Sequence, residues 1–334
     1  MKQKVLVAMS GGVDSSVAAL IMKKKGYEVI GAFMKNWSDS KNEFGECNWK
    51  DERRHAMKIA SILNVPLITL DFEKEYRRDV IEKMFKDYKK GITPNPDVDC
   101  NQKVKFPLLI KAAKKLGAKY VVTGHYSRIQ NRKGKYELVR GKDEMKDQSY
   151  FLYRINQTEL KHLLLPIGDY KKEQIRKIAE RNHFPNFNKK STVGICFVGK
   201  VNLKKFLQKR IKPKDGKILD PEGNVIGKHD GIYYYTIGQR IGTRFGINIE
   251  KIADENNKIK RWYVAKKDAK KNILVAAPEG HELLYRKDIT IKNHHWINSI
   301  PKKKMKVLAR IRQVGELLPA TLSYKEKKFL AVER

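Results

Sequence analysis

The chain has 334 residues, of which 72 are Lys or Arg and 37 are Asp or Glu, giving a formal net charge of +35. This length allows two or three domains, and a hydrophobic content of 41% is enough to build real cores, which excludes a disordered chain. So basic a balance is typical of proteins that bind a polyanion. A generally lysine-rich composition would explain part of the same excess.

Targeting signals are absent from the sequence. No run of about 18 apolar residues occurs, so we expect no transmembrane helix. The N-terminus leads directly into a predicted strand, so we expect no signal peptide. The cysteines, Cys47, Cys100 and Cys196, are too few for a disulfide framework and indicate a reducing compartment. We therefore expect a cytoplasmic protein without membrane contact.

Strands and helices alternate through the first part of the chain. The predicted strands are Lys4–Met9, Glu28–Lys35, Leu67–Phe72 and Tyr120–Gly124. The predicted helices are Ser15–Lys25, Asp51–Leu63, Glu73–Lys89 and Lys103–Leu116. Such alternation is typical of an α/β domain with a parallel sheet, in which ligands bind at the carboxyl ends of the strands.

The most informative stretch is residues 8–16, Ala-Met-Ser-Gly-Gly-Val-Asp-Ser-Ser, between the first predicted strand and helix. The two glycines let the backbone turn sharply and approach a ligand, and amides at a helix start attract an anion. No Gly-Lys-Ser/Thr follows, so this is not a Walker loop. The run resembles the pyrophosphate loop of the ATP-pyrophosphatase family, whose members adenylate an oxygen and release pyrophosphate. The alternative is a simple turn in which Asp14 or Ser15 caps the helix.

The pattern changes near residue 200. Residues 140–200 are mixed, with a helix predicted at Lys171–Arg181, and a short amphipathic helix is predicted at Val201–Arg210. Turn residues and β signals follow; for Tyr233-Tyr234-Tyr235 we favour a half-buried strand over base stacking. Later strands are predicted at Arg261–Ala265, Asn272–Ala277, Ile289–Lys292, Lys306–Gln313, Ala320–Tyr324 and Phe329–Val332. This spacing predicts a small barrel or sandwich.

Two cysteines stand in segments that favour chemistry. Cys100 ends a Pro- and Asn-rich loop and precedes a helical pattern, a position that lowers the pKa of a thiol. Three interpretations are open for Cys100 and Cys196: buried structural thiols, zinc ligands or a sulfur-transfer pair. Cys47 is interpreted as an inert core thiol. Zinc is disfavoured because no Cys-x-x-Cys occurs and His294-His295 lack ligand spacing. In a transfer pair, one thiol carries a persulfide and the second resolves it by exchange.

Seven segments, in order, resemble the bacterial tRNA-specific 2-thiouridylases over nearly the whole chain. They are Ser10–Ser15, Phe33–Trp37, Thr93–Asn101, Thr123–Tyr126, Lys146–Leu152, Gly194–Phe197 and Tyr235–Arg240. The resemblance implies an α/β fold with a parallel-sheet pyrophosphate-loop domain at 1–200. A small β-rich central domain at 201–262 and a C-terminal β-barrel-like tRNA-binding domain at 263–334 would follow. The implied activity is ATP-dependent 2-thiolation of the wobble uridine, position 34, of Lys-, Glu- and Gln-type tRNAs.

The same resemblance implies roles for single residues. ATP would be held by Ala8, Met9, Ser10, Gly11, Gly12, Val13, Asp14, Ser15, Met34 and Gly124. The target base would face Asn95, Pro96 and Asp97. The tRNA would contact His125, Lys146, Asp147, Gln148, Arg310 and Ile311. Asp97 would act as general acid or base, although Asn-Pro-Asp is also an ordinary turn. Cys196 would carry the persulfide and form a transient disulfide with Cys100.

Further expectations concern cofactors, partners and departures from the family. Magnesium is expected with ATP, near Asp14, without a resident metal site, and the sulfur would come from a cysteine desulfurase or a sulfur-relay protein. The family's later strands with a Pro-Gly-Gln segment have no match, so we expect a last barrel that is incomplete, closed differently or completed by another chain. Asp99 would raise the pKa of the Cys100 thiol. An amide-forming ATP-pyrophosphatase and a non-catalytic RNA-binding protein are the alternatives.

Overall fold

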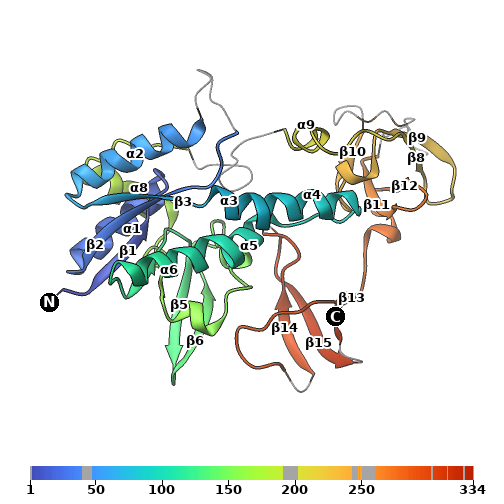
Figure 1. The fold of residues 1–334 in the computed structure, drawn as a ribbon. Coiled ribbons are helices and arrows are strands. Elements are labelled where there is room, and N and C mark those ends of the chain that lie inside the picture. The colour runs from blue at the N-terminus through green and yellow to red at the C-terminus, as the bar shows by residue number, and fades with distance from the viewer. Residues whose placement is uncertain are drawn as a thin grey trace. The chain divides into compact units, whose positions relative to one another are not determined.

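The computed structural model describes residues 2–39, 47–190, 202–242, 247, 249, 260–301, 304–313, 315–325 and 328–333 (Figure 1). The chain forms two compact units, each assembled from separate stretches of sequence. The first comprises residues 1–81, 96–200 and 292–329, and the second comprises residues 82–95, 201–291 and 330–334. The three consecutive domains expected from the sequence stay a prediction.

The first unit is built on a five-stranded parallel sheet with the strand order β3-β2-β1-β4-β7. Its strands are β1 (Lys4–Ala8), β2 (Glu28–Lys35), β3 (Leu67–Asp71), β4 (Tyr120–Val122) and β7 (Leu163–Leu164). The chain leaves β1 toward β2 and β3, whereas β4 pairs with the opposite side of β1. The carboxyl end of β1 therefore lies at a switch in strand order, where open α/β sheets bind ligands.

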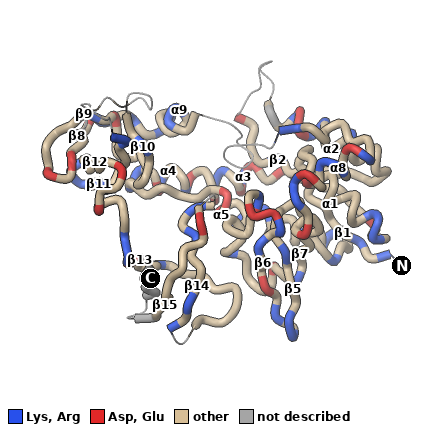
Figure 2. Tube along the Cα trace, turned by 180° about the vertical axis from the view of Figure 1, so that it is seen from behind, with Lys and Arg blue, Asp and Glu red and all other residues tan. Residues whose placement is uncertain are grey.

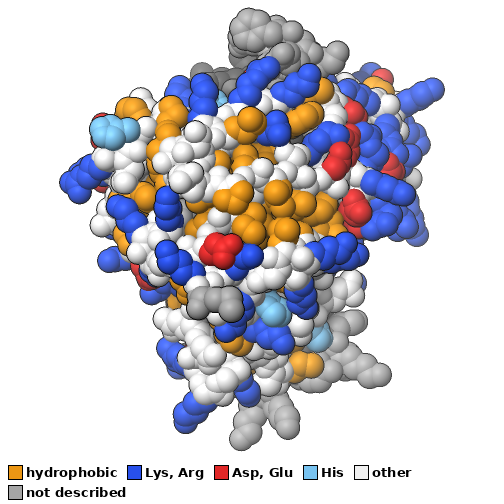
Figure 3. Space-filling model, turned by 60° about the vertical axis from the view of Figure 1, so that its left-hand side comes forward, with side chains coloured by type: hydrophobic (Ala, Val, Ile, Leu, Met, Phe, Trp, Pro, Cys, Tyr) orange, Lys and Arg blue, Asp and Glu red, His pale blue; other side chains and the backbone are white. Residues whose placement is uncertain are grey.

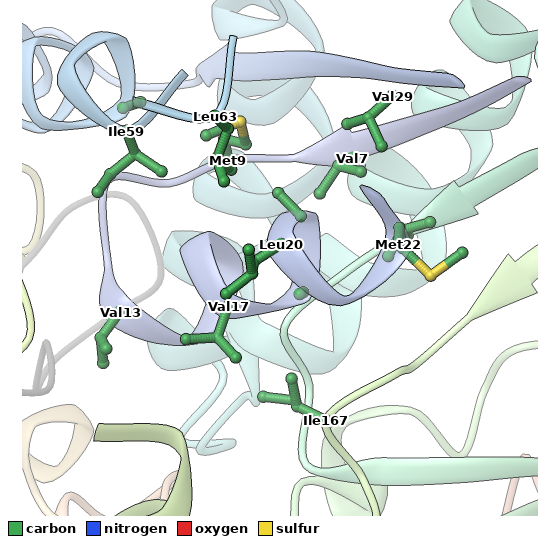
Figure 4. Close-up of a cluster of buried hydrophobic side chains, with 14 of the residues drawn as sticks. Val7, Met9, Val13, Val17, Leu20, Met22, Val29, Ile59, Leu63 and Ile167 are labelled. Carbon is green, nitrogen blue, oxygen red and sulfur yellow. The ribbon is translucent and has the colours of Figure 1, made fainter. Parts of the chain in front are cut away.

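Both faces of the central strand are covered. Val5 and Val7 belong to one buried cluster, and Leu6 belongs to another, because successive side chains of a strand point to opposite faces. The first cluster includes residues of α1 (Val13–Lys24), α2 (Asn48–Ile62) and α8 (Lys172–Arg181) (Figure 4). The second includes residues of α6 (Phe106–Lys115). This burial explains the continuous apolar sequence of β1.

A helical stretch begins earlier than the sequence predicts. α5 (Pro96–Cys100) continues through a π-helical turn at Asn101–Lys105 into α6. The loop expected up to Cys100 is therefore wrong, because Pro96 fits the first helical turn, where a missing N–H costs nothing. A second π-helical turn, at Arg77–Ile81, follows α3 (Glu73–Tyr76).

The first unit also contains a β-hairpin and a short helix that the sequence did not predict, together with two strands that it did. β5 (Ser127–Arg132) and β6 (Lys135–Arg140) form an antiparallel hairpin, whose turn residues Lys133 and Gly134 have φ of 51° and 81°. α7 (Gln157–Leu160) follows a 3-10 turn at Ser149–Phe151. β14 (Met305–Ala309) and β15 (Leu318–Lys325) pair antiparallel.

The second unit is β-rich, which confirms the predicted fold class. Its sheet has the order β10-β11-β12-β8-β9, and α4 (Glu82–Lys89) and α9 (Leu203–Gln208) also belong to this unit. The strands are β8 (Gly216–Leu219), β9 (Val225–His229), β10 (Arg240–Ile241), β11 (Trp262–Asp268) and β12 (Ile273–Pro278), with β13 (Asp288–Ile291) after them and β16 (Lys328–Glu333) near the chain end. None of the helices in the described ranges is long and apolar enough to cross a membrane.

The strand expected at Tyr233-Tyr234-Tyr235 is wrong. Residues Ile232–Tyr234 form a 3-10 turn, entered through Gly231 at φ 143°, and Tyr234 N–H donates to the Gly231 carbonyl. The Tyr235 hydroxyl donates to Asp230 at 2.7 Å, so that side chain is committed to the unit's own core. A positive φ breaks strand geometry, and only glycine adopts it readily.

His229 makes the stability of the second unit pH-dependent. Gly231 N–H donates to His229 Nδ1 at 3.1 Å, so Nε2 carries the proton and faces the Asn272 carbonyl. Burial lowers the pKa of the His229 imidazole in the folded unit. Just below about pH 6.5 the imidazole therefore stays neutral in the folded unit, whereas in the unfolded chain it takes up a proton. We expect the unfolding free energy to fall by up to about 1 kcal/mol as pH drops from about 7.5 to 5.5.

The matched variant is His229→Asn, whose Oδ1 can still accept from Gly231. Denaturant unfolding of both proteins at both pH values measures the effect, and the variant should lose less stability on acidification. An identical pH dependence in the two proteins would contradict this assignment.

Candidate functional site

The loop between β1 and α1 forms an uncapped helix start. Gly11 has φ 78°, and a Cβ there would collide with the backbone carbonyl of Glu52. Gly12 is the N-cap residue of α1 in an extended conformation, and no side chain caps the helix. The simple capping turn considered from the sequence is therefore wrong. Since the first amides of a helix have no intrahelical acceptor, they are left for an anionic ligand.

Two serine hydroxyls shape this turn from within. Ser15 Oγ accepts from Ser10 N–H at 3.2 Å and donates to the Gly12 carbonyl at 3.0 Å. Ser16 Oγ donates to the same carbonyl at 3.0 Å. The hydroxyls therefore hold the carbonyl of Gly12 and the amide of Ser10 in place.

Asp14, in the first turn of α1, is neutralised by a buried lysine. Lys172 Nζ, at the start of α8, lies 2.6 and 2.8 Å from the two oxygens of Asp14. The Tyr126 hydroxyl donates to Asp14 Oδ1 at 2.7 Å. Burial and the nearby Asp14 charge raise the pKa of Tyr126, so the phenol stays protonated as a donor. The carboxylate thus needs neither a cap nor a metal to be stabilised.

Other predicted nucleotide residues gather at the same sheet edge. Met34 is a buried residue of β2, and Gly124 follows β4. A Cβ on Gly124 would lie 2.7 Å from Ser15 N, so glycine is required where these backbones meet. Asn36, just past β2, is buried, and its side-chain amide has no hydrogen-bond partner among the described residues. The sequence analysis did not single out Asn36.

Asp97 and Cys100 lie three residues apart on α5, which places them on one face of the helix. Cys100 is fully buried one turn after Pro96, which agrees with a position near a helix N-terminus. Asn101, the next residue, donates through Nδ2 to the Phe151 carbonyl at 3.1 Å. Cys196 lies outside the described residues, so its pairing with Cys100 stays a prediction.

The structure encloses the side chain of Asp147, one of the predicted tRNA contacts. Its side chain is 1% exposed and accepts from Gly141 N, Ser149 N, Ser149 Oγ and Arg310 Nη1. The side chain therefore holds the loop and Arg310 together, and the tRNA contact expected of Asp147 stays a prediction. The Arg310 side chain forms an ion pair with Asp147, whereas the side chains of Lys146 and Ile311 are exposed.

Gln148 and His125 are tied to the end of β4. Gln148 Oε1 accepts from Tyr126 N–H at 3.0 Å. His125 Nδ1 lies 2.7 Å from the Thr123 hydroxyl, and its ring packs against Phe106. Burial and the charge of Lys105 lower the pKa of His125 well below its usual range, so the imidazole is neutral at pH 7. His125 can therefore contact RNA only as a neutral group.

Sequence reasoning missed Lys172 and Asn186 as site residues. Asn186 Nδ2 donates to the Gly11 carbonyl, and Lys172 contacts Asp14 from α8. Both contacts span more than 150 residues of chain, so no local pattern reports them. Tyr126 stood inside a quoted segment but had been given no role.

Comparisons with known proteins agree on one family. The tRNA methyl transferase HUP domain profile matches residues 3–200, and the tRNA methyl transferase PRC-barrel domain profile matches residues 204–278. The tRNA-specific 2-thiouridylase MnmA of Coxiella burnetii (strain Dugway 5J108-111) is 46% identical over 88% of this chain and 80% of its own length. That of Nitrosomonas europaea is 41% identical over 97% of this chain and 88% of its own.

Likeness to solved structures is weaker. A 4-thiouridine synthetase–RNA complex with bound ATP matches 62% of this chain and 50% of its own, at 14% identity and a TM-score of 0.39. Such a TM-score establishes neither fold nor function.

The ion pair under the loop should be strongly coupled. Lys172→Met removes the ammonium from the Asp14 carboxylate and leaves it the hydrogen bond from the Tyr126 hydroxyl, which should cost about 2 kcal/mol of unfolding free energy. This is less than for a fully buried pair because the Asp14 side chain is 29% exposed. Adding Asp14→Asn should restore part of that loss by removing the unpaired charge.

A double-mutant cycle by denaturant unfolding measures the coupling of these two side chains. Additive costs for the two substitutions would show that the pair contributes nothing beyond its separate members.

Proposed function

The chain belongs to the tRNA-specific 2-thiouridylase family, and we propose that it thiolates the wobble uridine, position 34, of Lys-, Glu- and Gln-type tRNAs. As a member of this family it is a tRNA sulfurtransferase that uses ATP. The observation that carries the proposal is the uncapped, glycine-rich start of α1 at the switch in strand order. It is the cradle that a reaction releasing pyrophosphate requires.

ATP would lie along the loop, with its phosphates on the amides of α1 and its base near Met34 and Gly124. The 2-oxygen of uracil is a poor leaving group, and adenylation converts it into part of AMP, a good one. The loop amides would stabilise the charge of the departing pyrophosphate. Magnesium would neutralise the same phosphates, and Asp14, in the first turn of α1, would offer it an oxygen if its contact with Lys172 opened. Asp97, on α5, would handle the proton.

Sulfur transfer would use the two predicted cysteines in sequence. The terminal sulfur of a Cys196 persulfide attacks the uracil carbon, and AMP leaves with the electrons of the C–O bond. The Cys100 thiolate then attacks Cys196 Sγ, which breaks the bond to the transferred sulfur and forms a Cys100–Cys196 disulfide. A thiol reductant restores both thiols. A cysteine desulfurase or sulfur-relay protein would supply the persulfide, and a reducing cytoplasm suits this cycle.

The cysteines give a direct test. Unmodified tRNA incubated with ATP, magnesium and a persulfide source should yield 2-thiouridine, detected by mass spectrometry of nucleosides. Cys100→Ser and Cys196→Ser should yield none, yet still release pyrophosphate in a single turnover, because adenylation precedes sulfur transfer. Cys47→Ser is the matched control and should keep activity.

Each competing function has its own outcome in this assay. Pyrophosphate release without any 2-thiouridine in the wild type, unchanged in both serine variants, would favour an amide-forming ligase, which needs no cysteine pair. No pyrophosphate release by the wild type, with tRNA still bound, would favour a non-catalytic RNA-binding protein.

The tRNA would meet a strongly basic surface. Lys and Arg occur along the elements of both units (Figure 2), and on the face drawn in Figure 3 they surround a hydrophobic area. With a net charge of +35, phosphate contacts should dominate affinity. The exposed residues Lys146 and Ile311 are the predicted contacts best placed to reach RNA.

Affinity for tRNA should fall steeply with salt. If six to ten phosphates are contacted, binding should weaken about 10³- to 10⁵-fold between 50 and 200 mM salt. Lys146→Ala should reduce the slope of log affinity against log salt by about one. Filter binding over a salt series measures both, and a flat salt response would rule out this electrostatic mode.

A further inference from the structure

We propose that Asn186 is a positioning residue for the phosphate-binding amides: it holds the Gly11–Gly12 peptide so that the Gly12 N–H faces the nucleotide. The inference rests on the proposed function, because it takes the loop to bind the pyrophosphate part of ATP.

Asn186 reaches the loop from the segment that follows α8. Its side-chain Nδ2 donates to the Gly11 carbonyl and to Ser16 Oγ, each at 3.0 Å. Ser16 Oγ donates in turn to the Gly12 carbonyl at 3.0 Å. Asn186 thus begins a short hydrogen-bond chain that fixes two consecutive carbonyls of the loop.

Holding these carbonyls also orients the amides. In a planar trans peptide the carbonyl and the following N–H point in opposite directions, so a donor on the Gly11 carbonyl turns the Gly12 N–H away from Asn186. Neither Gly11 nor Gly12 has a Cβ to resist rotation of the peptide between them. A flipped peptide would present a carbonyl oxygen, which repels phosphate. One well-placed donor therefore decides whether the anion site exists.

Packing alone does not explain an amide at this position. Asn186 is 2% exposed, and its Oδ1 has no hydrogen-bond partner among the described residues. A buried acceptor left unpaired costs free energy, which an apolar side chain of the same size would avoid. The two hydrogen bonds that Asn186 Nδ2 donates, to the Gly11 carbonyl and to Ser16 Oγ, offset this cost.

The chain that follows Asn186 is also anchored. Lys189 Nζ lies 2.7 Å from Glu52 Oε2, and the Lys189 carbonyl accepts from Arg176 Nη2. Glu52 is the residue whose carbonyl lies against Gly11. The segment that carries Asn186 is therefore tied to Glu52, the residue that packs against Gly11.

The test uses Asn186→Leu, which keeps the volume and removes both the donor and the unpaired acceptor. We expect an unchanged or higher melting temperature, a KM for ATP raised about 10- to 100-fold, and an unchanged KM for tRNA. The matched control is Asn182→Leu, because Asn182 Nδ2 also donates to a backbone carbonyl, that of Ile178, away from the loop. The control should keep the KM for ATP.

A direct readout needs neither tRNA nor a sulfur source. Titration with inorganic pyrophosphate should shift the ¹⁵N–¹H resonance of Gly12 in the wild type and much less in Asn186→Leu. Asn186→Asp, which keeps the shape but cannot donate to Gly11, is a second variant should the first fail to fold, and should also weaken pyrophosphate binding.

Wild-type pyrophosphate affinity in both Asn186 variants would overturn the inference, as would a wild type that does not bind pyrophosphate. A wild type that binds pyrophosphate with the expected Gly12 shift, but makes no 2-thiouridine, would sink the proposed function and leave the positioning role of Asn186 standing.

Discussion

The site depends on the neutralisation of Asp14 by Lys172 at the start of α1. A carboxylate in the first turn of a helix is favourable for the helix dipole, but it would repel a phosphate bound to the same amides. The buried ammonium, 2.6 and 2.8 Å from the two oxygens, cancels that repulsion, and the Tyr126 hydroxyl satisfies a further acceptor position. The helix start is thereby left positive toward an anion, while its backbone is held from beneath by Ser16 and Asn186.

The same contacts extend through the first unit. Tyr126 donates to Asp14 through its hydroxyl and to Gln148 through its amide, and the neighbouring Asp147 binds Arg310. A continuous path of hydrogen bonds and one peptide link therefore joins the nucleotide loop to the segment after β14. Residues expected to face tRNA and residues expected to face ATP therefore share this set of contacts.

Elements whose burial creates a strong periodic pattern were predictable from the sequence. β2 has the predicted bounds, and β1, β3, α1 and α8 differ from prediction by a few residues, since each buries a continuous face. The failures occurred where local residues obey a different constraint. Pro96 was interpreted as a loop signal but begins a helix, and Gly231 at φ 143° converts an apparent tyrosine strand into a 3-10 turn.

By itself the sequence determined the glycine-rich loop between β1 and α1, the α/β class of the first unit and the family, because glycine placement and hydrophobic period are local properties of the chain. Only the tertiary structure decided that Asp147 is enclosed, that Lys172 pairs with Asp14, and that Asn186 holds the loop. These are contacts between residues that lie far apart in the sequence. They form because buried charges and buried backbone carbonyls need hydrogen-bond or ion-pair partners. No pattern along the chain records which partner folding will bring.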